Sequence, residues 1–122
     1  MYPPGDRTPS ALLAAGLTTA EGGLWLDDDR NVGAATTNAG AFVGWVDVLW
    51  PDPSRPVRRL RDVVHVPLME GDEIRAELDR ARERREAALQ TCRHCERRLI
   101  PGHMHSSDIC QRCAERQLGV VN

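Results

Sequence analysis

All four cysteines of the chain lie in two Cys-x-x-Cys pairs. The first pair is Cys92 and Cys95, the second is Cys110 and Cys113, and fourteen residues separate them. A two-residue gap lets one tight turn aim two sulfurs at the same ion, and zinc takes four such ligands at tetrahedral corners, at about 2.3 Å. Four-cysteine zinc patterns have an intervening gap of about 15–20 residues, so this gap is a minor departure. The spacing predicts one Zn²⁺ site with four thiolate ligands.

Other chemistries of paired cysteines stay open. A thioredoxin-like redox pair needs a βαβ context, which the pattern lacks. Structural disulfides need an oxidising compartment, and no secretion signal is visible in the sequence. An iron–sulfur cluster is also held by four thiolates. His94, His103 and His105 could replace a cysteine as ligands, but four thiolates already complete the zinc shell, so we expect these histidines to be exposed loop residues.

The residues around the cysteines predict how they are presented. Residues 114–118 are strong helix formers and Gly119 is a natural helix stop, so Cys110 and Cys113 are expected at the first turn of a short helix. Between the pairs, residues 97–100 predict a short strand, and Pro101-Gly102 predicts a turn. A knuckle, a hairpin and a helix that carries the second pair form the treble-clef arrangement.

One known family shares these motifs. The combination of Cys92-x-x-Cys95, Ile100-Pro101 and Ile109-Cys110-x-x-Cys113, preceded by a charged helix, resembles the C-terminal zinc finger of the DksA/TraR family. Those proteins bind bacterial RNA polymerase, and they also carry a helical arm with an acidic tip. No such helical hairpin is visible here, and the resemblance covers about the last thirty residues. It therefore implies the fold of the finger more than the activity.

Composition divides the chain into four segments and predicts an α+β protein. Residues 1–23 are expected to form a tail with a short helix, residues 24–69 a β-barrel, residues 70–90 a charged helix, and residues 91–122 the zinc finger. The net charge is −2, so attraction of the whole molecule to nucleic acid is not expected. All sixteen basic residues are arginine, which suits recognition of phosphate and carboxylate, although a GC-rich genome would give the same bias.

The second segment has the pattern of a small β domain. Strands are predicted at 24–26, 32–37, 41–50, 57–61 and 63–66, with polar turns between them. Five short strands over so few residues suggest a closed barrel of the SH3 type. The run from Gly44 to Asp52, followed by Val57-Arg-Arg-Leu-Arg-Asp-Val-Val, is similar to Tudor and KOW-like barrels.

Aromatic and arginine side chains are the candidates for binding a partner. The tryptophans could form a cation cage or a base-stacking platform, or they could simply fill the barrel. The arginines of the predicted return strand could bind phosphates, or could keep an edge strand from aggregating. The predicted nucleic-acid or partner-binding residues are Arg58, Arg59, Arg61, Arg97, Arg98, Trp45 and Trp50.

The third segment predicts a helix from Asp72 to about Gln90. A narrow apolar stripe, interrupted by Arg85, runs along an otherwise charged surface and consists of Ile74, Leu78, Ala81 and Ala88 or Leu89. A solvated connector is the preferred interpretation, and a dimerising helix is the alternative.

Taken together, these patterns predict a binding protein rather than an enzyme. No nucleophile with a partnering histidine, no phosphate loop and no paired acids in an apolar setting are visible. The leading hypothesis is a small cytoplasmic regulator that binds RNA polymerase or nucleic acid, with no small-molecule substrate and no membrane segment. A structural adaptor, for example in a phage assembly, is the alternative. A treble-clef nuclease is a weaker option, because His103 and His105 lack the further ligands that such a site needs.

Overall fold

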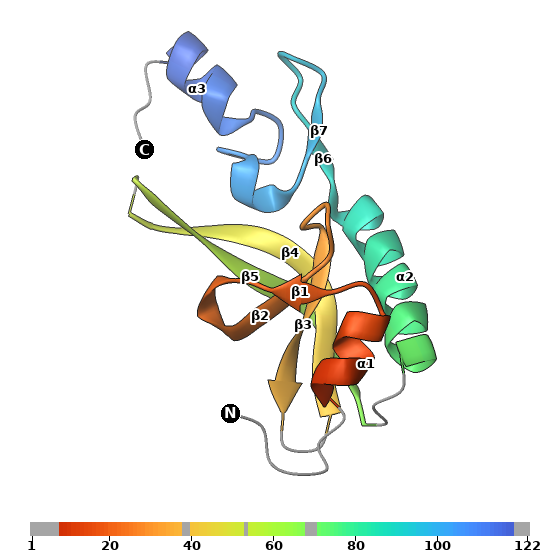
Figure 1. The fold of residues 1–122 in the computed structure, drawn as a ribbon. Helices are drawn as coiled ribbons and strands as arrows, with labels where there is room; N and C mark the ends of the chain where they lie inside the picture. The colour runs from red at the N-terminus through yellow and green to blue at the C-terminus, as the bar shows by residue number, and fades with distance from the viewer. Residues whose placement is uncertain (1–7, 38–39, 53, 68–70, 119–122) are drawn as a thin grey trace. The chain divides into compact units, whose positions relative to one another are not determined.

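The computed structural model describes residues 8–37, 40–52, 54–67 and 71–118 (Figure 1). The first seven residues of the predicted N-terminal tail, and the predicted helix stop at Gly119, lie outside them. No helix of the described part is long and apolar enough to cross a membrane. The elements are α1 (Thr8–Ala14), β1 (Thr18–Thr19), the 3-10 helix η1 (Glu21–Gly23), β2 (Leu24–Leu26), β3 (Val32–Thr37), β4 (Gly40–Asp52), β5 (Arg55–Val66), α2 (Gly71–Ala88), β6 (Gln90–Thr91), β7 (Arg98–Leu99), the 3-10 helix η2 (Pro101–His103) and α3 (Gln111–Leu118).

The spatial contacts between Cα atoms divide the chain into two compact units. The first holds residues 1–46 and 60–84, and the second holds residues 47–59 and 85–122. Strands β4 and β5 contribute residues to both units, because their outer ends are grouped with the C-terminal part of the chain. The segment boundaries expected from composition stay a prediction.

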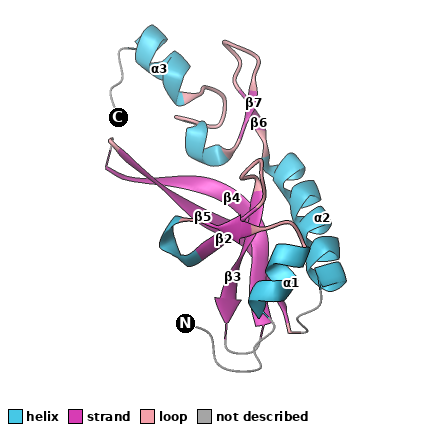
Figure 2. Cartoon of the chain, viewed as in Figure 1, coloured by secondary structure: helices cyan, strands magenta, loops and turns pink. Residues whose placement is uncertain are grey.

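The larger sheet is antiparallel and has five strands in the order β1-β2-β3-β4-β5. Figure 2 draws the strands in magenta. Leu24 pairs with Ala35 across β2 and β3, which confirms the predicted hairpin. In the next ladder Ala34 pairs with Val43. Each strand therefore pairs with its neighbour in the sequence, as short polar turns favour.

The predicted closed barrel is wrong. Closure requires the first and last strands to pair, and β1 and β5 lie at opposite edges of the sheet. Strand β1 has only two residues, whereas β5 has twelve, so β1 offers too short a ladder to close the sheet. The outer part of β5 is also grouped with the second unit. The result is an open sheet.

The core of the first unit lies between this sheet and two helices. Along β4 the side chains of Ala41, Val43 and Trp45 are buried, whereas Phe42 is 41% exposed. Strand geometry places alternate residues on opposite faces, so the buried set shares one face. Helix α1 buries Leu12, and α2 buries three residues of its apolar stripe, Ile74, Leu78 and Ala81, all at 0% exposure.

The burial of that stripe corrects the interpretation of α2 as a solvated connector. The predicted helix and its apolar face are both present, but the face packs inside the first unit. The C-terminal end of the stripe differs, because Ala88 and Leu89 are half-buried and belong to the second unit.

Strand β5 is continuous over Arg55–Val66, where two shorter strands were predicted. Asp62, the residue expected to break it, has a left-handed φ of 51° and stays within the strand. Gly44 lies against β5, and a Cβ atom there would fall 2.5 Å from the carbonyl oxygen of Arg61. The close approach of the two backbones requires glycine at this position.

The second unit contains the smaller sheet. Strands β6 and β7 pair with Gln90 opposite Leu99, and an isolated bridge joins Met104 to Cys110 just before α3. The predicted strand over 97–100 and the predicted short helix after Cys110 are confirmed.

Candidate metal centre

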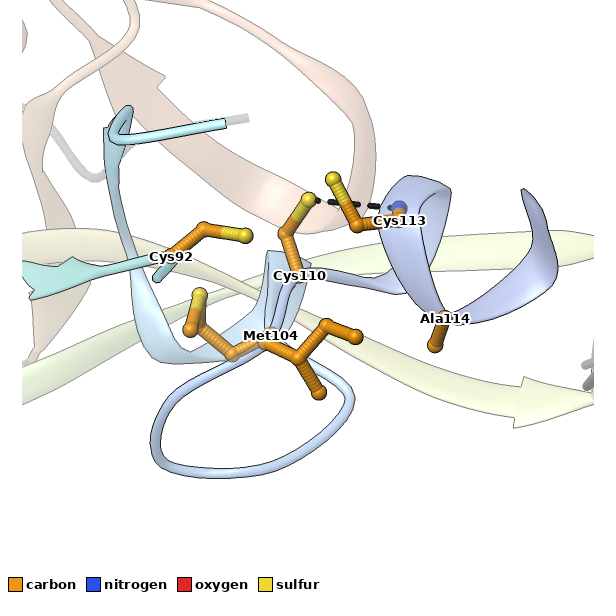
Figure 3. Close-up of a cluster of buried hydrophobic side chains, with 6 residues drawn as sticks. Cys92, Met104, Cys110, Cys113 and Ala114 are labelled. Carbon is orange, nitrogen blue, oxygen red and sulfur yellow. Dashed lines mark hydrogen bonds between the residues drawn. The ribbon is translucent and has the colours of Figure 1, made fainter. Parts of the chain in front are cut away.

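The four cysteines come from two turns of the second unit. Cys92 follows β6 and Cys95 lies in the turn between β6 and β7. Cys110 forms the bridge with Met104, and Cys113 is the third residue of α3. In Figure 3 the sulfurs of Cys92, Cys110 and Cys113 face a common space.

The spacing of the sulfur atoms fits a single ion. All four Sγ atoms lie within 4.8 Å of one another, and those of Cys95 and Cys110 are 3.9 Å apart. A regular tetrahedron with Zn–S bonds of about 2.3 Å has edges of about 3.8 Å. The four cysteines are free, and 3.9 Å is far longer than a disulfide bond. An iron–sulfur cluster would place iron and sulfide between the cysteines and spread them further, so the geometry favours one Zn²⁺ ion.

Backbone hydrogen bonds fix both turns. The N–H of Cys92 donates to the carbonyl of Arg97 at 2.9 Å, and the N–H of Glu96, whose φ is 62°, donates to the carbonyl of Cys92 at 2.8 Å. The N–H of Arg93 donates to the carbonyl of Asp108 at 2.8 Å, which joins the two turns. The N–H of Cys113 donates to Sγ of Cys110 at 3.5 Å. These hydrogen bonds hold the two turns in the arrangement that brings the sulfurs together.

The pKa values of two of the thiols, Cys92 and Cys113, are shifted in opposite directions. Burial, the largest effect on Cys92, raises its pKa, but hydrogen bonds from the backbones of Cys110, Cys95 and His94 together outweigh burial and lower it from 9.0 to about 6. The hydrogen bond between Cys113 and the Cys110 sulfur, followed by burial, raises the pKa of Cys113 from 9.0 to about 12. The Cys92 thiol therefore loses its proton readily, whereas the Cys113 thiol keeps its proton. A divalent cation removes this conflict, because it supplies the charge that four adjacent thiolates need.

Apolar side chains close the site on one side. Met104 and Ala114 are buried together with Cys92, Cys110 and Cys113 (Figure 3). Ile109 belongs to the same cluster, and Leu99 packs against it. Cys95 is exposed. His94, His103 and His105 are all exposed, as predicted.

Two residues outside the cysteine motifs hold the loop between the cysteine pairs, and no sequence motif predicted this role for them. Asp47 of β4 is 1% exposed and bonds to the backbone of Gly102, in the loop between the two cysteine pairs. Trp50 donates its Nε1–H to the carbonyl of Gly102 at 2.8 Å. In the sequence, only the position of the charged Asp47 within an otherwise apolar strand indicated a bond such as that to Gly102.

The residues predicted to bind a partner do not form one group. Trp45 is 1% exposed, its Nε1–H donates to Asp62 at 2.8 Å, and the guanidinium of Arg61 lies 5.3 Å from its ring centroid. In this structure Trp45 therefore packs inside the first unit. Trp50 is half-buried. The partner-binding role of these residues stays a prediction.

The predicted arginines differ in exposure and pairing. Arg59 is exposed, Arg58 and Arg61 are half-buried, and all three lie on β5. In the finger both Arg97 and Arg98 are exposed, and the guanidinium of Arg98 bonds to Glu86 at 3.3 Å.

Comparison of the chain with protein-family models, with curated proteins and with solved structures gives no match. The metal centre therefore rests on the geometry of these four cysteines.

Proposed function

We propose that this protein is a non-enzymatic zinc-binding recognition protein whose partner is nucleic acid or the bacterial transcription machinery. The observation that carries the proposal is the cluster of four cysteine sulfurs within 4.8 Å of one another. Four protein thiolates complete the tetrahedral shell of zinc and leave no position for substrate or activated water. Such a centre stabilises a small module instead of performing catalysis.

The order of elements around the sulfurs supports a treble-clef finger of the DksA/TraR type. The first pair lies in the turn of the β6–β7 hairpin, and the second pair begins α3 after the Met104–Cys110 bridge. A module of this size buries little apolar surface, so bound zinc would contribute much of its folding free energy. The finger then serves as a rigid support for the side chains on its surface.

The charge of that surface supports an anionic partner. Residues 91–122 contain five arginines against three acids, although the molecule as a whole carries a net charge of −2. Arg58 and Arg59 belong to the same unit as the finger. Guanidinium groups match phosphate oxygens with two parallel hydrogen bonds. Binding to nucleic acid would therefore be local, and sensitive to salt.

The test is to measure binding of the zinc-loaded chain to labelled single- and double-stranded oligonucleotides over a range of salt concentrations, with an RNA polymerase pull-down in parallel. Replacing Arg58, Arg59 and Arg61 together by glutamine should weaken oligonucleotide binding and lower its salt slope. Failure to retain either partner at low salt would overturn the proposal.

A structural adaptor is the second candidate, and exposed apolar side chains favour it. Phe42, Val63 and Val64 of the first unit are 41%, 46% and 39% exposed, and the ring of Phe42 lies 5.1 Å from that of His65. An adaptor in an assembly, for example that of a phage, would use such a surface to bind protein. Affinity purification with and without nuclease treatment separates the two candidates. Loss of partners with nuclease, or retention of RNA polymerase, favours the first candidate, whereas retention of other proteins favours the adaptor.

A further inference from the structure

An open cavity of about 200 Å³ lies beside the cysteine cluster, within the second unit. It is smaller than the roughly 300 Å³ at which pockets for drug-sized molecules begin. A single phosphoryl group or one nucleotide fragment is a better match for it. The residues that line it are Arg97, Leu99, His103, Cys110, Gln111 and Arg112.

The two arginines of this cavity differ from two others in the same module. Arg93 forms an ion pair with Asp108 at 3.3 Å, and Arg98 forms one with Glu86 at 3.3 Å. Within the described part of the chain, no ion pair or hydrogen bond engages the guanidinium of Arg97 or Arg112. Both side chains are exposed. Each can therefore bind an external anion without first breaking an internal contact.

The remaining lining groups also favour an anion. No carboxylate is among the described residues that line the cavity. Gln111 and Arg112 begin helix α3, where the first backbone N–H groups have no partner within the helix. His103 adds ring nitrogens, and Gln111 bonds only loosely, its Nε2 lying 3.4 Å from the carbonyl oxygen of Gly102. Leu99 supplies one apolar wall.

We propose that this cavity binds a phosphoryl group, held between the guanidinium groups of Arg97 and Arg112. This inference deepens the proposed function and rests on it for the source of the phosphate, which would be the phosphodiester of a nucleic-acid strand. A free phosphate or phosphorylated metabolite presents the same oxygens, so the experiment separates the two sources.

The negative charge of the zinc-loaded centre makes both arginines necessary for anion binding. Zinc with four thiolates carries a formal charge of −2, and Cys110 forms part of the cavity wall. An anion entering the cavity is repelled by this charge and must be compensated by the guanidinium groups. Loss of either arginine should therefore weaken binding strongly, whereas loss of a similar charge elsewhere on the finger should not.

The experiment compares Arg97→Gln and Arg112→Gln with Arg93→Gln, which removes the same charge from an arginine that does not line the cavity. Zinc content and thermal midpoint establish that each variant is folded. Inorganic phosphate and a short single-stranded oligonucleotide are titrated into the zinc-loaded full chain, and backbone amide NMR shifts and fluorescence anisotropy report binding. We expect each cavity variant to bind the oligonucleotide about tenfold more weakly, as for a lost charge-assisted hydrogen bond, with a salt slope lower by about one. Arg93→Gln should change affinity by less than about twofold.

The outcomes separate this inference from the proposed function. If the oligonucleotide binds and all three variants weaken it equally, the cavity is not the site and the function stands. If the oligonucleotide does not bind but phosphate shifts the amides of residues 111–113 in an arginine-dependent manner, the cavity is an anion site for a free phosphorylated ligand and the nucleic-acid function fails. If neither probe binds, the cavity inference and the nucleic-acid form of the proposed function both fail, and the RNA polymerase pull-down alone decides the other form.

Discussion

The carboxylate of Asp47 accepts a hydrogen bond at 2.8 Å from the backbone N–H of Gly102, fifty-five residues away in the sequence. The same oxygen accepts the N–H of Val48 at 2.9 Å. Trp50, on the same strand, bonds to the carbonyl of Gly102. Both backbone polar groups of one residue in the loop between the cysteine pairs are therefore bound by β4, so a strand far from the cysteines in sequence helps to hold the metal centre.

Asp47→Ala should destabilise the zinc-loaded protein by about 2–4 kcal/mol, because it leaves two backbone N–H groups without an acceptor in a buried setting. Asp52→Ala is the matched control, since Asp52 lies on the same strand and, among the described residues, bonds to the nearby Ser54 and Arg55. It should change stability by less than about 0.5 kcal/mol. Urea unfolding measures both, and equal losses would show that the Asp47–Gly102 bond contributes nothing.

Gly102→Ala should also be costly. A Cβ atom at this position would lie 2.2 Å from the carbonyl oxygen of Val48, so the backbones must separate. Overpacking of this kind costs about 1–3 kcal/mol. At Gly71 the nearest atom is the Cβ of Ala14 at 3.1 Å, so Gly71→Ala should cost much less. Thermal unfolding of the two variants gives the comparison, and a neutral Gly102→Ala would contradict the contact.

The purified, reduced chain should contain one zinc ion per molecule. Replacement of any of the four cysteines by serine should lower zinc affinity by at least about tenfold and destabilise the second unit, because a thiolate ligand is lost. His94→Ala and His105→Ala are the controls and should keep full zinc content, since neither side chain belongs to the sulfur cluster. Elemental analysis after dialysis against a chelator measures this. Loss of zinc from a histidine variant alone would assign a different ligand set.

The metal-free chain should be most stable near pH 9. The pKa of Cys92 is about 6 in the folded chain and 9.0 in the unfolded chain. Its contribution to the free energy of unfolding is therefore complete above pH 9 and is lost as the pH falls through about 6. Cys113 has the opposite shift, so its contribution is complete below 9.0 and is lost as the pH rises through about 12. Thermal unfolding with chelator and reductant across this range tests the profile, with thiolate absorbance as an independent readout. A profile without a maximum between pH 6 and 12 would contradict these shifts.

Trp45→Ala should destabilise the first unit by about 3–5 kcal/mol, as loss of a buried aromatic side chain does. Leu49→Ala on the same strand is the control, because Leu49 is 45% exposed and its loss should cost little. If Trp45 instead serves as a binding platform, its replacement will lower partner affinity with little change in the midpoint of unfolding. Tryptophan fluorescence during denaturant unfolding distinguishes these results.

Local spacing was enough to predict several parts of this protein. The two Cys-x-x-Cys pairs predicted a four-sulfur cluster because each turn spans only a few residues, and the sulfurs do meet. The β2–β3 hairpin, strand β4 and helix α2 follow from turn residues and from the spacing of apolar side chains. These features depend on contacts between residues that are close in sequence, so the sequence by itself determined them.

Only the tertiary structure decided how these elements combine. The sheet stays open because β1 is too short to pair with β5, a property of strand order that no local pattern contains. Trp45 and the apolar residues Ile74, Leu78 and Ala81 of α2 are buried in the first unit, whereas the sequence pattern also allowed these side chains to contact a partner. Asp47 binds Gly102 because the fold brings a strand and a loop together across fifty-five residues. Such contacts depend on the packing of the whole chain, and local sequence patterns do not predict which two residues will meet.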